Sequence, residues 1–414
     1  MTSWIARSVA LLAIAVVAAG CSKETTQKSA RASTPIPAAT LSSMASIGAT
    51  KTSPVLIRAY KKESEIEVWK QTSSGEYALL KTYPVCRWSG QLGPKKREGD
   101  RQVPEGFYTV SAGQMNPNSS MWLSFNVGYP NPLERSLGRN GGDIMVHGTC
   151  SSRGCFAMTN GQMEEIYAIA REAFVGGQKS MQFQSYPFRM TAENLSKFRN
   201  DPNIAFWKNL KEGSDRFEVS KRAPTVGYCG TRYAFDTDSE PSCSGDEPAD
   251  AIDTAVIAKQ KADEAQVASL MSSGTRAISM RYADGDQHAS FRSLHQTPEF
   301  KKMDAAGEFS RPEALAQISE VPFETPSTPV TNVAKVETPS AAKPVIVANA
   351  TKSTPIIPTL SLFSIGSLFK STTASDTETI DTARAEETPV LDWFKSNEKP
   401  STFPANIPLP PRRG

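Results

Sequence analysis

The sequence is poor in the side chains that most often bind metals. It has three histidines and six cysteines in 414 residues, and one histidine and two cysteines, His147, Cys150 and Cys155, fall within one short window. A zinc site usually needs about four ligands, typically in pairs about two to four residues apart. These three residues have no second cluster to complete such a set. Neither a metal nor any other cofactor is therefore expected.

A high net charge is also missing. The formal net charge of the chain is +3 at pH 7, and no stripe of basic residues interleaved with aromatic ones appears. Proteins that bind nucleic acid usually show such a basic footprint. Nucleic acid is therefore not expected as a partner.

The N-terminal apolar run is too short to cross a membrane. It extends from Val9 to Ala19, about 11 residues, whereas a transmembrane helix needs about 20. Arg7 precedes the run, as is typical of an export signal. Small residues directly before Cys21 resemble a bacterial lipobox, after which Cys21 would carry lipid; an ordinary cleaved signal is the alternative. The sequence thus predicts a periplasmic protein anchored to a membrane by lipid.

Short alternating segments dominate the chain from about residue 54. Val55, Ile57 and Ala59 alternate with polar neighbours, and a second such run follows. This period of two indicates half-buried strands joined by a turn. The segments 76–86 and 105–112 continue in the same style, so a compact β-rich domain is expected.

One amphipathic helix is expected after Thr159 or Asn160, either of which can cap it. Gly176 and Gly177 should end it. The apolar residues that would share its buried face are Met163, Ile166, Tyr167, Ala170 and Phe174.

Composition divides the chain into five parts. After about residue 245 it is rich in Pro, Thr, Ala and Val, without periodic burial, and cannot offset the entropy of ordering. The predicted fold class is α+β, mainly β with helices added. The parts are a signal peptide (1–20), a flexible tether (21–53), the β-rich domain (54–190), a helical extension (191–245) and a disordered tail (246–414).

Residues 144–160, IMVHGTCSSRGCFAMTN, pose the main chemical question. A Cys150–Cys155 disulfide is sterically conceivable, but it leaves the neighbouring His147 unexplained. A nucleophilic thiol with its base explains that histidine, because an imidazole that takes the proton lowers the thiol pKa from its usual value of about 8.5. Gly154 would let amide N–H groups approach a developing oxyanion.

These residues resemble the active-site signature of the YkuD-type L,D-transpeptidase catalytic domain, most closely its YafK branch. The likeness covers about residues 50–228 in order. It includes GQLGPKKREGDRQVPEGFYTV, NVGYPNPLER, IMVHG, GCFAMTN, YPFRMT and FWKNLKEGSDRFE. The resemblance implies a two-sheet β-sandwich with a catalytic groove, and acyl transfer on peptidoglycan stem peptides during the wall biogenesis that sets cell shape.

The resemblance also implies roles for single residues. Cys155 would be the nucleophile and His147 the proton donor and acceptor. The candidates for oxyanion or substrate binding are Gly148, Ser152, Arg153 and Gly154.

Two positions depart from the family pattern. Arg153 stands where the family usually has histidine before Gly-Cys, which leaves His147 as the only base. Ala157 stands where arginine often follows the cysteine. The missing cation would otherwise hold a stem-peptide carboxylate, a task that Arg153 could take over.

We therefore expect an L,D-transpeptidase that forms an acyl-enzyme on Cys155. One alternative is an amidase that releases a wall-linked outer-membrane protein from diaminopimelate. Ala157 favours it, because an amide-linked donor has no free carboxylate to hold and because alanine there would widen the groove. The other alternative is a non-catalytic wall-binding lipoprotein. Such a protein would not need a free thiol beside a histidine.

Disulfides are expected between Cys86 and Cys150 and between Cys229 and Cys243, because export places the chain in an oxidising compartment. Four cysteines allow three pairings, so the others remain open. The tail carries no catalytic residue, and deleting residues 250–414 is expected to leave activity on soluble fragments unchanged.

Overall fold

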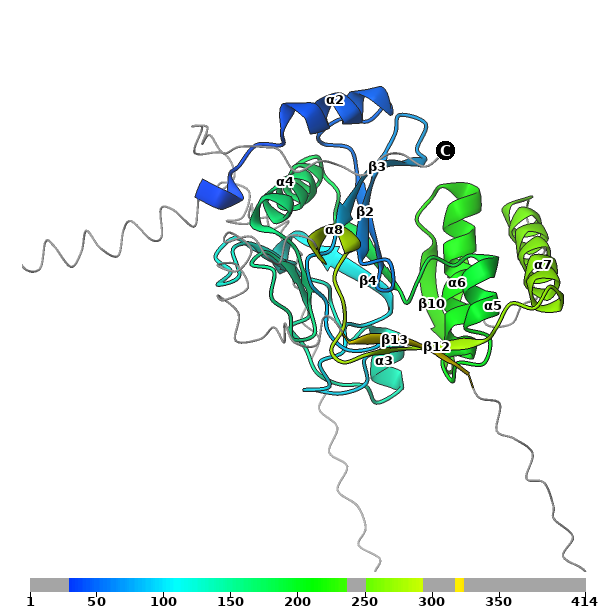
Figure 1. Ribbon diagram of the computed structural model, residues 1–414. Coiled ribbons are helices and arrows are strands. Elements are labelled where there is room, and N and C mark those ends of the chain that lie inside the picture. The colour runs from blue at the N-terminus through cyan, green and yellow to red at the C-terminus, as the bar shows by residue number, and fades with distance from the viewer. Residues whose placement is uncertain (1–29, 237–250, 293–316, 324–414) are drawn as a thin grey trace, which may run out of the picture. The chain divides into compact units, whose positions relative to one another are not determined.

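The computed structural model describes residues 30–236, 251–292 and 317–323 (Figure 1). The predicted signal peptide, the lipidation site Cys21, Cys243 and most of the predicted tail lie outside these ranges. Within them, none of the helices combines the length and the apolar character needed to cross a membrane.

Five strands form the larger sheet, in the order β3-β2-β1-β9-β4. β1 lies at its centre, antiparallel to β2 and parallel to β9. The alternating pattern predicted half-buried strands here, but every residue of β1 is buried, because both faces of the sheet are covered. The strands are β1 (Val55–Tyr60), β2 (Glu65–Gln71), β3 (Tyr77–Pro84), β4 (Gly106–Ser111) and β9 (Ser180–Tyr186).

A second sheet, in the order β5-β6-β7-β8, carries the histidine of the catalytic signature. Phe183 of β9 packs against Phe125 and Phe156 of this sheet, with ring centroids 6.2 and 5.7 Å away. The two sheets therefore share one apolar core, and the predicted α+β class with a two-sheet sandwich is confirmed. The strands are β5 (Met115–Asn116), β6 (Ser124–Asn126), β7 (Met145–His147) and β8 (Phe156–Ala157).

Helix α4 (Asn160–Val175) packs on this core and contacts β1, β6 and β7 (Figure 1). Thr159 is its N-cap and forms a capping box with Gln162, which satisfies amides that the first turn leaves without partners. Gly176 ends the helix. The helix begins and ends where the apolar periodicity predicts.

The other face of the larger sheet is covered by α5 (Ala192–Lys197) and α6 (Ile204–Ser220). Phe188, Phe198 and Trp207 form an aromatic cluster there, with centroids 4.7 to 6.0 Å apart. The expected helical extension also contains a hairpin, because Gly230 allows a tight turn between two short strands. Its strands are β10 (Thr225–Cys229) and β11 (Arg232–Asp236). Two short elements lie earlier in the chain: η1 (Ala112–Gln114) follows β4, and α3 (Pro132–Ser136) lies between β6 and β7.

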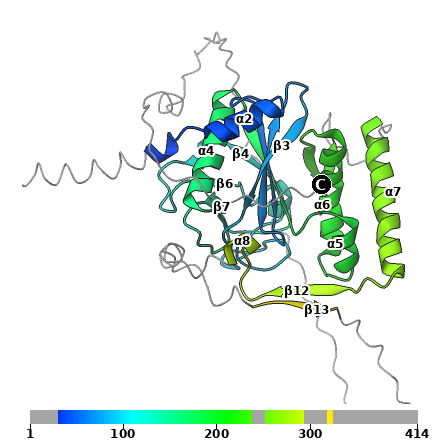
Figure 2. The same ribbon diagram turned by 45° about the horizontal axis from the view of Figure 1, so that its top comes forward.

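Part of the predicted disordered tail is folded. Helix α7 (Ala251–Ser272) lies beside α5 and α6 (Figure 2), where Lys211 pairs with Asp263, and Lys259 with Asp215, at N–O distances of 2.5 and 3.1 Å. The sequence indicates a transient helix over residues 250–271, and these ion pairs help to hold it as a folded helix. The other elements here are β12 (Ile278–Tyr282), α8 (Ala289–Arg292) and β13 (Ile318–Pro322).

The predicted tether is also partly folded. Helix α2 (Ala38–Ser46) buries Met44, and the hydroxyl of Thr40 donates a hydrogen bond to Glu165 of α4. Arg171 of α4 donates hydrogen bonds to the carbonyls of Ala32 and Thr34. The folded part of the chain therefore begins before residue 54.

Candidate active site

His147 ends β7, and Cys155 directly precedes β8, the neighbouring strand of the second sheet. β7 and β8 run parallel, with Val146 opposite Phe156 and His147 opposite Ala157. Continuing this register places Cys155 opposite Met145, whose amide donates a hydrogen bond to the Cys155 Sγ over 3.4 Å. Cys155 thus lies against β7, beside Met145, which is two residues from His147 along that strand.

The ring of His147 is buried and its orientation is fixed. Its Nδ1 lies 2.6 Å from the carbonyl oxygen of Gly148. A carbonyl oxygen can only accept, so Nδ1 carries the proton, and in the neutral ring the lone pair is on Nε2. Nε2 is thus the atom that can take a proton. Among the hydrogen bonds of the described residues, none joins this ring to Cys155.

Cys155 is the free cysteine of the described part of the chain, and it is half-buried. Burial raises the pKa of its thiol, although the Met145 amide and the charges of Lys95 and Arg153 act in the opposite direction. Burial also lowers the pKa of His147. The sequence analysis expected an imidazole that takes the proton and lowers the thiol pKa; the structure instead favours a neutral thiol beside a neutral ring.

Ser152 and Ser89 hold the backbone that carries the nucleophile. The hydroxyl of Ser152 donates to the carbonyl of Cys155 over 2.7 Å and accepts from its amide over 3.2 Å. The hydroxyl of Ser89 accepts from the amide of Gly154 over 2.5 Å and lies 3.2 Å from the Ser152 hydroxyl. Ser152, an expected substrate or oxyanion residue, is therefore fully engaged in holding the loop.

The expected oxyanion donors are also engaged. The amide of Gly154 points at Ser89, and the amide of Gly148 donates to the carbonyl of Leu123 over 3.2 Å. Gly154 is required for a different reason, since its φ of +109° is a conformation that other residues rarely adopt. In this arrangement, neither glycine offers an open N–H to an oxyanion.

A disulfide joins Cys86 to Cys150, the pairing that the sequence analysis expects. Thr149 and Cys150 both have left-handed φ values, +72° and +51°, which cost about 1–2 kcal/mol each. The disulfide holds this stretch of backbone between His147 and Cys155. The amide of Thr149, which donates a hydrogen bond to the side-chain oxygen of Asn160 over 2.8 Å, also holds it. Cys229 is also disulfide-bonded, and its expected partner lies outside the described residues.

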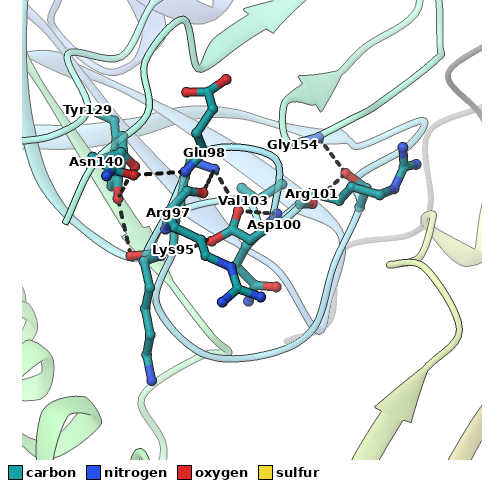
Figure 3. A network of polar contacts seen from close by, with 12 residues as sticks. Lys95, Arg97, Glu98, Asp100, Arg101, Val103, Tyr129, Asn140 and Gly154 are labelled. Atoms are coloured by element: carbon teal, nitrogen blue, oxygen red, sulfur yellow. Dashed lines mark hydrogen bonds and ion pairs between the residues drawn. The ribbon is translucent and has the colours of Figure 1, made fainter.

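The loop 95–101 forms a polar wall near the nucleophile. Lys95 pairs with Asp100 over 2.6 Å, and the Asp100 carboxylate also accepts from backbone amides of the loop. Asn140 accepts from the amide of Glu98 over 2.9 Å. Figure 3 shows Gly154 at one end of this network and Lys95, Tyr129 and Asn140 at the other. The loop is therefore a rigid structure that carries several cations.

The two positions that depart from the family pattern differ in exposure. The side chain of Arg153 is exposed directly before Gly154 and Cys155. Ala157 is fully buried, and its backbone pairs with that of Arg87 as well as with that of His147. The expectation that alanine here widens the groove is therefore wrong, because the Cβ of Ala157 lines no open surface.

Sequence reasoning missed several residues that contact the catalytic loop. Arg101 belongs to the block 90–110 that resembles the family, and Ser89 directly precedes that block, but the sequence does not show that either residue lies close to Gly-Cys. The backbone carbonyl of Asp143 accepts from the thiol of Cys155 over 3.8 Å, a contact that does not depend on the type of residue at position 143. Asp284 pairs with Arg101, and no signal in the sequence pointed to it.

Comparison with known proteins places the chain in a family. Residues 49–176 match the family model described as the L,D-transpeptidase catalytic domain, YkuD. The Escherichia coli (strain K12) protein that bears the provisional name L,D-transpeptidase YafK is 41% identical over 181 residues, which cover 44% of this chain and 73% of that protein. The protein of the same name from Escherichia coli O157:H7 matches equally.

Two solved structures show weaker likeness. The helical cell shape determining protein Pgp2 from Campylobacter jejuni is 18% identical, with a TM-score of 0.27 over 58% of this chain and 79% of that one. Bd1075 from Bdellovibrio bacteriovorus is 12% identical, with a TM-score of 0.25 over 44% of this chain and 85% of that one. On its family match and its identity to YafK, the chain belongs to the YkuD family of L,D-transpeptidases.

Proposed function

We propose that the chain is an exported, lipid-anchored cysteine acyltransferase that acts on peptidoglycan stem peptides. The observation that carries this proposal is the placement of a free, half-buried thiol, Cys155, against the strand β7 that ends at His147, a buried histidine with Nε2 unprotonated. Membership of the L,D-transpeptidase family supplies the reaction class and peptidoglycan as the substrate.

In the first step the Sγ of Cys155 attacks the carbonyl carbon at the L-centre of a diaminopimelate residue. The thiol proton passes to Nε2 of His147, and the carbonyl oxygen becomes an oxyanion. As the tetrahedral intermediate collapses, the C–N bond breaks and the leaving amine takes the proton from His147. The product is a thioester on Cys155 and a free amine.

In the second step an acceptor resolves the thioester. An amine attacks the thioester carbonyl and gives its proton to Nε2 of His147; the thiolate then leaves and is reprotonated. Burial raises the pKa of the Cys155 thiol and lowers the pKa of His147, which favours the neutral form of each group before attack. Arg153, exposed beside the nucleophile, is the residue that would hold a carboxylate of the donor.

Water in place of the acceptor amine would make the enzyme a hydrolase. The sequence favours hydrolysis partly through a wider groove at Ala157, and the burial of that residue removes this part of its support. Transfer is therefore the function proposed, and release of wall-linked protein is the outcome that would replace it.

The test offers purified enzyme a tetrapeptide donor with an amine acceptor and, separately, wall that carries covalently attached lipoprotein. Mass spectrometry follows both mixtures, with Cys155→Ala as the control. New cross-links in the first mixture, absent with the control, support transfer. Free lipoprotein from the second mixture, without cross-links in the first, would show a hydrolase instead.

A further inference from the structure

Residues 278–292, called the strap here, lie outside residues 49–176, which match the family model, yet they contact the catalytic sheet. The backbone of Arg87 forms a β-bridge with Ala157 of β8, and the backbone of Trp88 forms one with Asp286 of the strap. The strand order β7-β8 therefore continues through residues 87–88 into the strap. Backbone groups at a sheet edge need partners, and the strap supplies them.

Close packing holds the strap in this position. Gly285 has a φ of +70°, and a Cβ there would lie 2.0 Å from the carbonyl oxygen of Trp88, so only glycine fits. The ring of Tyr282 meets that of Trp88 edge-on, with centroids 5.0 Å apart. Phe291 is buried against the disulfide between Cys86 and Cys150. The strap thus covers the back of the site.

Asp284 is the charged residue that the strap directs toward the catalytic loop. It is 3% exposed, and its carboxylate accepts from Nε of Arg101 over 3.1 Å and also from its Nη2. The amide of Gly90 donates to the same carboxylate over 3.3 Å, and Nη2 of Arg87 lies 3.9 Å away. A buried carboxylate that accepts two hydrogen bonds from one guanidinium group fixes the orientation of that group, here Arg101, strongly.

Arg101 passes this constraint to the nucleophile. Its Nη2 donates to the carbonyl of Ser152 over 3.4 Å, and its own carbonyl accepts from the hydroxyl of Ser89 over 2.8 Å. These are the two serines that hold the amides of Gly154 and Cys155. A continuous series of polar contacts therefore runs from Asp284 to the backbone of the nucleophile.

We propose that Asp284 is a positioning residue for Cys155, acting through Arg101, and that the strap is an integral part of the active centre. For its effect on turnover this inference rests on the proposed function. Its effect on the loop does not, because the contacts exist without substrate. Small displacements of a reacting atom by distant changes can lower a rate up to about a hundredfold, and a loosened loop would do so here.

The experiment compares Asp284→Asn with Asp286→Asn in the full-length protein. Asp286 is an equally buried carboxylate of the strap that pairs with Arg292 over 3.1 Å, so it is a matched control for general damage to the strap. Hydrogen exchange of the amides of Gly154 and Cys155 should become about tenfold faster in Asp284→Asn and stay unchanged in the control. Arg101→Met should accelerate exchange similarly, with no further change in the double variant.

Turnover provides the second measurement. We expect the rate constant of acyl-enzyme formation to fall about tenfold in Asp284→Asn, with KM for the donor within about twofold of wild type. Unchanged exchange, or equal acceleration in Asp284→Asn and Asp286→Asn, would overturn the inference. A higher KM with an unchanged rate constant would also overturn it. If wild-type enzyme forms no acyl-enzyme, the proposed function fails, and exchange alone decides the inference.

Discussion

At the scale of single residues, the proposed chemistry depends on two groups, Cys155 and His147, whose neutral forms burial favours. His147 donates from Nδ1 to the Gly148 carbonyl, so the orientation of the ring does not depend on Cys155. Cys155 has a pKa above that of an ordinary thiol, and His147 a pKa below that of an ordinary histidine. The catalytic pair therefore differs from a resting thiolate–imidazolium pair.

This difference predicts the pH dependence of the thiol. Alkylation of Cys155 by iodoacetamide should rise with pH, with a midpoint above the value of about 8.5 for a free cysteine. The sign follows from burial, which favours the uncharged thiol and so moves its deprotonation to higher pH. The same protein denatured in urea gives the reference midpoint. A folded-state rate that has already reached its plateau at pH 6 would indicate an ion pair and contradict this account.

His147→Ala tests the base. The variant should keep the fold, since the ring makes one hydrogen bond to its own neighbour, and should lose about 10²- to 10⁴-fold in the rate of acyl-enzyme formation. Single-turnover mass spectrometry measures this rate, and circular dichroism checks the fold. A rate within about threefold of wild type would remove His147 from the mechanism.

At the scale of elements, the disulfide between Cys86 and Cys150 crosses 64 positions of sequence and joins the segment after β3 to the catalytic loop. A loop of that length predicts a contribution of about 4 kcal/mol to the free energy of unfolding. Replacing both cysteines by alanine should therefore lower stability in urea and also lower activity, because Thr149 and Cys150 hold left-handed backbone beside His147.

The matched control replaces Cys229 and Cys243 by alanine. That expected bridge closes a short loop and should contribute about 3 kcal/mol. Its removal should lower stability without lowering the activity of folded protein. Equal losses of activity in both pairs of variants would show that the first disulfide has no particular role at the site.

Elements whose apolar periodicity is local could be predicted from the sequence. The alternation around Val55 gave β1 and β2, and the capped apolar stripe after Thr159 gave α4. The sequence predicts α7 only as a transient helix and does not predict the strap, because ion pairs and backbone bridges to distant residues hold them in place. Local sequence carries no record of such partners.

The site divides in the same way. His147 and Cys155 were found because their residue types are rare in this chain and their signature resembles that of a family. The loss of Gly154 and Gly148 as open donors could not be foreseen, because their amides bond to Ser89 and Leu123, which come from other segments. Nor does sequence show that burial would reverse the expected pKa shift of the thiol.

At the scale of the whole molecule, the part of the chain after residue 250 reaches back to the catalytic domain. The sequence analysis expected deletion of residues 250–414 to leave activity on soluble fragments unchanged. The contacts of Asp284 and Trp88 predict the opposite: a loss of about tenfold or more, because the loop that carries Cys155 loses one of its supports.

Steady-state turnover of a soluble tetrapeptide donor measures this effect. Deletion of residues 324–414 is the control, since it leaves α7 and the strap in place. If both deletions keep full activity, the folded part of the tail has no role in catalysis. If both deletions lose activity, residues 324–414 are instead required for turnover.

The most direct measurement is the intact mass of the enzyme after brief incubation with a tetrapeptide donor and no acceptor, followed by peptide mapping. The account predicts a thioester adduct on Cys155 that contains the donor without its terminal residue, and release of that residue. Addition of an acceptor amine should discharge the adduct, and Cys155→Ala should form none. Wild-type enzyme that turns over donor with no adduct on Cys155, or with the adduct on another residue, would contradict the account.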